Sequence, residues 1–164
     1  MLYFAYGSNM SSARLQKRVP SAVPLGCYKL EEHDLRFHKV GKDNSGKGDA
    51  YITHNKNDVV YGALFRIEES EKPALDRAEG LGQGYREKEI NVIDLAGGIE
   101  SAVTYTAIMI DESLKPYSWY LNHVLRGAEE NGLPENYIEE KILAVEAVKD
   151  SNTERAAGER AIQR

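Results

Sequence analysis

The sequence predicts an α+β fold, a small closed mixed β-barrel with flanking helices. Strand-like segments fill the first two-thirds of the 164 residues and helical patterns fill the last third, which favours α+β over a wound parallel sheet. About six strands in one small domain often close into a barrel, because closure removes the exposed strand edges. A chain of this length is most simply one domain with its own buried core.

The expected strands are short apolar runs bounded by turn residues. They cover residues 2–6, 25–40, 50–53, 59–67, 85–95 and 101–110. Alternation supports two of them, since Leu35 and Phe37 share one face, as do Tyr61, Ala63, Phe65 and Ile67. Residues 42–49 are polar and contain glycine, so we interpret them as a loop between strands.

Helices are expected at four places. Ser11 or Ser12 can cap a short helix that runs to about Arg18, before Pro20 blocks it. Ser70 is the expected N-cap of a second helix, which ends at Glu79 because Gly80 stops it. An apolar stripe predicts a third helix; it consists of Tyr117, Tyr120, Leu121, Val124, Leu125 and Ala128. A fourth helix is expected over residues 135–148.

The end of the chain differs from the rest. We expect one domain over residues 1–150 and a polar tail over 151–164, for which a surface helix and disorder are both open. The apolar stripe, with Trp119 beside it, could pack on the barrel or against a second subunit.

Composition and charge exclude several classes of protein. The net charge is −5 and basic residues are dispersed among acidic ones, which argues against nucleic-acid binding. No apolar run is long enough to span a bilayer, and the first residues do not resemble a secretory signal. Cys27 is the one cysteine, so an internal disulfide is impossible and a reducing, cytoplasmic location is expected.

Three familiar motifs are weak here. The stretch "GKDNSGKG" at 41–48 has phosphate-loop spacing, but Gly48 replaces the Ser or Thr and no helix follows. The four histidines lack metal-ligand spacing, so we predict no metal. Ser8 follows a strand, yet the context of a nucleophile elbow is missing and no His–Asp pair is evident.

Two further features are ambiguous on their own. The first strand ends in Tyr6-Gly7-Ser8-Asn9, whose backbone N–H groups could bind an anion, although a structural turn is the simpler interpretation. Glu79 ends a helix, where the macrodipole disfavours a carboxylate and raises its pKa. That position suits a general base, although on spacing alone an exposed surface Glu is the simpler interpretation.

Together, and in this order, these features resemble the γ-glutamylcyclotransferase family. The matching stretches are "YFAYGSNM" at 3–10, "LDRAEG" at 75–80 followed by Tyr85, and "GAEENGLPENYIEEKILAVE" at 127–146, with Tyr120 ahead of the last. The resemblance implies a small barrel, an enzyme without a metal or organic cofactor, and, weakly, a homodimer.

The resemblance also implies a reaction and its residues. A γ-glutamyl amino acid would give 5-oxoproline and a free amino acid, because the substrate's own α-amine attacks its γ-carbonyl. Glu79 would be the general base and then the acid. The substrate-binding residues would be Tyr3, Phe4, Ala5, Tyr6, Gly7, Ser8, Asn9, Tyr85 and Tyr120.

Two alternatives remain at this point. A related cyclotransferase would act on γ-glutamylamines such as γ-glutamyl-ε-lysine, on glutathione or on a biosynthetic intermediate. A protein of another class would bind γ-glutamyl groups without catalysis.

Overall fold

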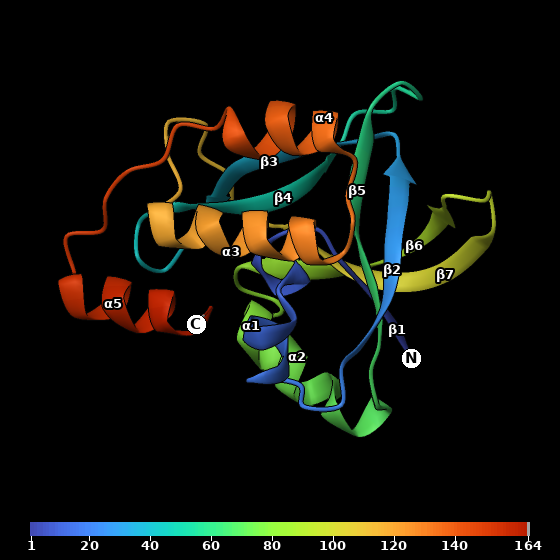
Figure 1. Ribbon diagram of the computed structural model, residues 1–164, viewed down its shortest axis with the longest axis horizontal. Helices are drawn as coiled ribbons and strands as arrows, with labels where there is room; N and C mark the ends of the chain where they lie inside the picture. The colour runs from blue at the N-terminus through green and yellow to red at the C-terminus, as the bar shows by residue number, and fades with distance from the viewer. Residues whose placement is uncertain (164) are drawn as a thin grey trace.

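A computed structural model describes residues 1–163, and its centre is a closed five-stranded barrel (Figure 1). The barrel order is β1-β5-β2-β6-β7, while β3 and β4 form a separate two-stranded sheet. The strands are β1 (Leu2–Ala5), β2 (Val23–Glu31), β3 (His33–Val40), β4 (Gly46–Ile52), β5 (Val59–Arg66), β6 (Tyr85–Asp94) and β7 (Ile99–Ala107). The barrel is mixed, because β1 pairs with β5 antiparallel and with β7 parallel. The predicted fold class is confirmed.

The sequence missed one strand boundary, in the segment 25–40. It is two strands, because Glu32 between them has a left-handed φ of 62°. Glu32 N–H donates to Asp58 O and Glu32 O accepts from Thr53 N–H, which hold this turn. A glutamate seldom adopts that conformation, so the residue type gives no warning of the break.

Two further strand limits also differ from the prediction. The strand β4 begins at Gly46 rather than at residue 50, and Gly46 N–H donates to Lys115 O. Glycines are poor strand formers, so Gly46 and Gly48 favour a loop in the sequence pattern. The strand β7 ends at Ala107, and Ile110 beyond it forms an isolated bridge with Lys39 of β3 instead.

The described residues also form five α-helices and three further 3-10 or π-helical segments, which flank the barrel (Figure 1). They are η1 (Ser8–Met10), α1 (Ser12–Gln16), η2 (Glu69–Glu71), α2 (Lys72–Glu79), α3 (Ser118–Glu130), α4 (Glu135–Ile138), the π-helical η3 (Glu139–Leu143) and α5 (Thr153–Ala161). None of the helices in this described part of the chain is long and apolar enough to cross a membrane.

The predicted helix caps can be compared with the observed helix ends. Ser11 caps α1, since its Oγ accepts from Arg14 N–H at 3.3 Å. The prediction for Ser70 was wrong: it lies inside η2, and α2 begins at Lys72 with a proline in its first turn. Gly80 does end α2, in a left-handed conformation with φ 64°. The helix predicted over 135–148 ends at Leu143.

The helix α3 packs its apolar stripe inside the chain. Tyr120, Val124 and Ala128 are buried in the same core as the barrel residues. Gly127 lets α3 approach the loop after β1, because a Cβ on Gly127 would lie 2.4 Å from Ser11 N. This contact fixes the loop 7–11 against a rigid helix.

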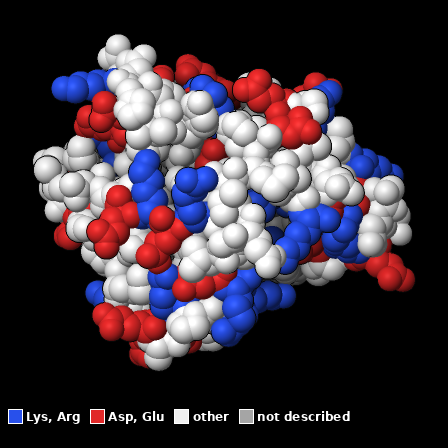
Figure 2. All heavy atoms as spheres, turned by 180° about the vertical axis from the view of Figure 1, so that it is seen from behind, with Lys and Arg blue, Asp and Glu red and all other residues white. Residues whose placement is uncertain are grey.

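The tail forms α5 and packs against α3, so the helical alternative for this segment is the observed one (Figure 1). Asn152 caps α5, and Ala156 is buried. Glu159 Oε2 accepts a hydrogen bond from buried His123 of α3 at 2.8 Å. Arg164, the last residue of the expected tail, lies outside the described residues. Acidic and basic side chains are interspersed over the back of the molecule (Figure 2).

Candidate active site

A small recess lies where β1 ends and α2 ends. Its walls come from the loop after β1, from α2, from the strands β4, β6 and β7, and from α3. The lining residues are Tyr3, Tyr6, Gly7, Ser8, Asn9, Gly48, Glu79, Tyr85, Tyr105 and Tyr120. We call this the inner recess. One carboxylate, that of Glu79, therefore faces five tyrosines and a bend of backbone.

Asn9 joins the loop after β1 to Glu79. Its Nδ2 donates to Glu79 Oε1 at 2.6 Å and to Tyr3 Oη at 3.2 Å. Its Oδ1 accepts from Arg18 Nη1 at 2.9 Å, which fixes the orientation of the amide. The two features that the sequence left ambiguous thus share one cavity.

Glu79 is half-buried and is the last residue of α2. Burial raises the pKa of its carboxyl above the ordinary value, while Arg18, Lys39 and Arg14 and the Asn9 amide act in the opposite direction. The helix C-terminus, which the sequence indicated, also disfavours the charged form. The result is a carboxylate that is more basic than an exposed one.

Tyr120 and Tyr85 hold the strand β4 on two sides of Gly48. Tyr120 Oη accepts from Gly48 N–H at 2.9 Å, and Tyr85 Oη donates to Gly48 O at 2.6 Å. A Cβ on Gly48 or on Gly7 would lie 3.3 Å from Tyr120 Oη, so both glycines keep the space around this hydroxyl open. Burial raises the pKa of both tyrosines, which keeps their hydroxyls protonated.

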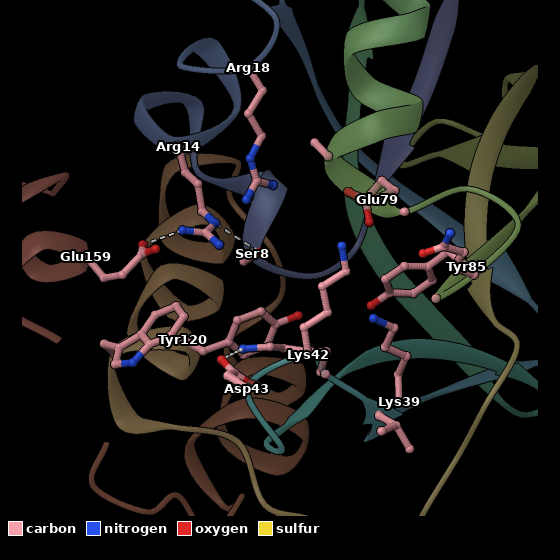
Figure 3. A pocket seen from close by; sticks show the side chains of 18 of the residues that line it. Ser8, Arg14, Arg18, Lys39, Lys42, Asp43, Glu79, Tyr85, Tyr120 and Glu159 are labelled. Carbon is pink, nitrogen blue, oxygen red and sulfur yellow. Dashed lines mark hydrogen bonds and ion pairs between the residues drawn. The ribbon is translucent and has the colours of Figure 1, made fainter. Parts of the chain in front are cut away.

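Ser8 is oriented by a chain of contacts that reaches α5. Arg14 Nε donates to Ser8 Oγ at 3.3 Å, and the Arg14 guanidinium pairs with Glu159 (Figure 3). Within residues 1–163, the backbone N–H groups of Gly7, Ser8 and Asn9 have no intramolecular acceptor. Three donors at the end of β1 therefore remain available to a ligand.

A larger cleft of about 510 Å³ opens from the inner recess. It shares Ser8, Glu79, Tyr85 and Tyr120 with the recess and continues between α1, the β3–β4 hairpin and α5. Its charged lining residues are Arg14, Arg18, Lys39, Lys42, Asp43, Lys47, Glu79, Arg155 and Glu159. We call this the outer cleft, and Figure 3 shows many of these side chains.

Comparisons with known proteins agree with this geometry. The model of the AIG2-like family matches residues 59–140. The γ-glutamylcyclotransferase of Mus musculus is 36% identical over 149 residues, which cover 88% of this chain and 78% of that protein. The chain belongs to the γ-glutamylcyclotransferase family.

Solved structures agree with this assignment to the γ-glutamylcyclotransferase family. A structure named gamma-glutamyl cyclotransferase has a TM-score of 0.86 and 27% identity, over 99% of this chain and 97% of that one. A Homo sapiens protein described as uncharacterized has a TM-score of 0.87 and 27% identity, over 99% and 98% of the two chains.

The family's expected site residues fall into two groups in the structure. Eight of the ten line the inner recess: Tyr3, Tyr6, Gly7, Ser8, Asn9, Glu79, Tyr85 and Tyr120. Phe4 and Ala5 do not. Phe4 is fully buried and its carbonyl accepts from Thr104 Oγ1, while Ala5 pairs with Ala63 in the barrel wall.

Sequence reasoning missed several residues around this γ-glutamylcyclotransferase-family site. Gly48 and Tyr105 line the inner recess, and the cations of the outer cleft were not singled out. Gly48 belongs to the stretch 41–48, whose spacing was considered only as that of a phosphate loop. The alternation of apolar residues along its strand predicts that Tyr105 is buried but does not indicate that it lines a site.

The histidines and Cys27 lie apart from the inner recess. His38 pairs with Asp49 at 2.7 Å and His123 with Glu159, while burial raises the pKa of the Cys27 thiol to about 11. In the described part of the chain, no group of three or more His, Cys, Asp or Glu side chains is arranged to hold a metal ion.

Proposed function

We propose that this chain is a γ-glutamylcyclotransferase that converts γ-glutamyl amino acids into 5-oxoproline and free amino acids. In this reaction the neutral α-amine of the substrate bonds to its own γ-carbonyl carbon. The bond between that carbon and the amide nitrogen then breaks. One proton passes from the attacking nitrogen to the leaving nitrogen, so the protein supplies no nucleophile.

Glu79 is the proposed proton carrier. It accepts the proton as the new C–N bond forms and delivers it to the leaving nitrogen. The observation that carries the proposal is the 2.6 Å hydrogen bond from Asn9 Nδ2 to Glu79 Oε1, which ties the base to the loop after β1. The raised pKa of Glu79 supports this role, because a more basic carboxylate is a better proton acceptor near neutrality.

The loop after β1 is the proposed holder of the glutamyl end. The free N–H groups of Gly7, Ser8 and Asn9 suit a carboxylate or a developing oxyanion. Tyr85 and Tyr120 form the opposite wall and restrict the glutamyl chain to a folded shape. Closing a five-membered ring needs such positioning more than it needs strong activation.

The direct test is detection of 5-oxoproline by mass after incubation with γ-glutamyl dipeptides. Release of 5-oxoproline and of the free amino acid in equal amounts supports the proposal. A panel of γ-glutamyl-alanine, γ-glutamyl-ε-lysine and glutathione also separates the substrate alternatives, because the chemistry is the same and only the leaving group differs.

A non-catalytic γ-glutamyl-binding module is the alternative of another class. The presence of Glu79 in the recess favours an enzyme, since binding alone does not need a carboxylate of raised pKa there. Tight binding of γ-glutamyl compounds without any 5-oxoproline release would support the module instead.

The homodimer and the cytoplasmic location stay predictions. The stripe residues Tyr120, Val124 and Ala128 are already buried within one chain, so a dimer would have to use other apolar residues. Exposed ones include Met109 of the segment after β7 and Leu143 of η3. Light scattering of the purified protein measures the assembly, and cell fractionation measures the location.

A further inference from the structure

Three cationic side chains of the outer cleft are not neutralised by the protein. Arg18, Lys39 and Lys42 direct their charged ends toward the space in front of Glu79 and Tyr85 (Figure 3). Within residues 1–163, no carboxylate lies within ion-pair distance of any of the three. Among the same residues, the hydrogen bond that the Arg18 guanidinium donates goes to the neutral amide oxygen of Asn9.

The other cations of the outer cleft are paired. Arg14 pairs with Glu159, Lys47 with Asp43 at 2.9 Å, and Arg155 with Asp150 at 2.6 Å. Within each pair the positive and negative charges cancel. The net sign of the cleft therefore depends on Arg18, Lys39 and Lys42 against the single carboxylate of Glu79.

Lys39 is a nearly buried cation without a charged partner within ion-pair distance among the described residues. Its residue is only 8% exposed, its Nζ lies 4.5 Å from the centre of the Tyr85 ring, and the structure gives that Nζ no hydrogen-bond acceptor among the described residues. Gly84 leaves room for it, because a Cβ there would lie 2.8 Å from Nζ. Burial lowers the pKa of this amine, and an anionic ligand would offset that cost.

A charge count indicates what this cleft would bind. At neutral pH three cations oppose at most one negative charge from Glu79, which leaves an excess of at least two positive charges. Because the glutamyl α-carboxylate is assigned to the N–H groups of the inner recess, the α-carboxylate of an ordinary acceptor amino acid supplies one negative charge to the outer cleft. A second carboxylate on the acceptor would balance the excess.

Building on the proposed cyclotransferase function, we propose that the outer cleft selects γ-glutamyl substrates whose leaving amino acid carries a second carboxylate, as in γ-glutamyl-glutamate. Lys42 and Arg18 are the proposed partners of the acceptor carboxylates, and Lys39 adds its charge from beneath. A γ-glutamyl-ε-lysine substrate would bring an extra ammonium to the same place and is disfavoured. The inference thus separates two alternatives that the sequence leaves open.

The test compares γ-glutamyl-glutamate with γ-glutamyl-glutamine, which has nearly the same shape but a neutral amide. We expect kcat/KM to be about tenfold higher for the acidic substrate at low salt, since each partly exposed charge pair contributes a few-fold. Added salt should reduce this preference. The variant Lys42→Gln, at an exposed position, should lower this preference by roughly threefold, because the second carboxylate loses one of its cationic partners.

Lys56→Gln is the matched control. Lys56 is an exposed lysine in the turn between β4 and β5, away from the cleft, so the same change of charge there should leave the preference intact. A preference that falls equally in both variants would reflect net charge and would overturn the inference.

Activity and substrate preference can be tested separately. Equal kcat/KM for the two substrates in the wild type overturns the inference and leaves the cyclotransferase function standing. If no substrate is turned over, the function fails, and calorimetry of the two dipeptides with the wild-type protein then decides the selectivity. Equal affinities in that calorimetry would overturn the inference as well.

Discussion

The inner recess and the outer cleft share four residues yet have different chemistry. The recess holds one carboxylate among tyrosine hydroxyls and free backbone N–H groups, whereas the cleft has an excess of cations. The recess contains Glu79, the carboxylate that we propose accepts and returns a proton. The cleft contains cations that would only attract the substrate. We therefore expect substitutions in the recess to change kcat and substitutions in the cleft to change KM and substrate preference.

Glu79→Gln should have the largest effect. The amide keeps the size of the side chain but cannot accept the proton, so kcat should fall by about two to four powers of ten while γ-glutamyl binding persists. Rates of 5-oxoproline release and calorimetric affinities measure the two parts.

Protein stability is the control for Glu79→Gln. The pKa of Glu79 is raised on folding, so the folded state holds this proton more tightly and loses stability as pH rises past the ordinary carboxyl pKa. The variant should therefore be at least as stable as the wild type at neutral pH. A lower melting temperature together with lost binding would indicate a structural role instead.

Asn9→Ala should have the next largest effect. It removes the hydrogen bond to Glu79 and leaves Arg18 without its acceptor, so we expect about a tenfold to hundredfold lower kcat, as for the loss of a charge-assisted bond. Steady-state kinetics measure this loss. Asn57→Ala, in the exposed turn before β5, is the control and should behave as wild type. Unchanged kcat in Asn9→Ala would separate the loop from catalysis.

The pH profile should sharpen the distinction between recess and cleft. Glu79 acts as a base only when ionised, so kcat/KM should decrease as pH falls through its raised pKa. Arg18 lowers that pKa, hence Arg18→Gln should move the acidic limb to higher pH. Profiles from about pH 4 to about pH 8 measure the shift. A limb that moves to lower pH would contradict the assignment of Glu79.

Tyr120→Phe should destabilise the fold moderately. It removes the acceptor of the buried Gly48 N–H, and an unsatisfied buried donor costs about 1–3 kcal/mol. Urea unfolding measures the free energy change, with Tyr51→Phe at an exposed position of β4 as the control. Equal stabilities of the two variants would mean that Tyr120 does not hold the strand in place.

Glu159→Gln should have the smallest effect. Arg14 would lose its charged partner but keep an oxygen acceptor, so KM should rise a few-fold with kcat nearly unchanged. Glu154→Gln, in the exposed first turn of the same helix, is the control for kinetic assays.

A chain that ends at residue 150 tests whether residues 1–150 are enough for activity. Unaltered kinetics of this shortened chain would exclude any contribution of α5 to the reaction.

The sequence predicts local features well and spatial convergence poorly. The cap at Ser11 and the stop at Gly80 depend on neighbouring residues, and both are present. The break at Glu32 depends on tertiary hydrogen bonds, in which Asp58 O accepts from Glu32 N–H and Thr53 N–H donates to Glu32 O, and no local pattern contains them.

The inner recess and the outer cleft differ in the same way. Gly7 to Asn9 and Glu79 were ambiguous in their local context, and the resemblance to a known family made them site candidates. The cations Arg18, Lys39 and Lys42 are ordinary residues of the turn after α1, of the strand β3 and of the loop after β3, and only the fold brings them to one cleft. Phe4 and Ala5 were included through their neighbours in the sequence, although β1 directs them into the barrel wall.

The most direct measurement is a crystal structure of the Glu79→Gln variant with γ-glutamyl-glutamate bound. We expect the glutamyl α-carboxylate to lie on the N–H groups of Gly7 to Asn9 in the inner recess, with the acceptor carboxylates beside Lys42 and Arg18. A dipeptide bound in the reverse direction, or outside both spaces, would contradict this expectation.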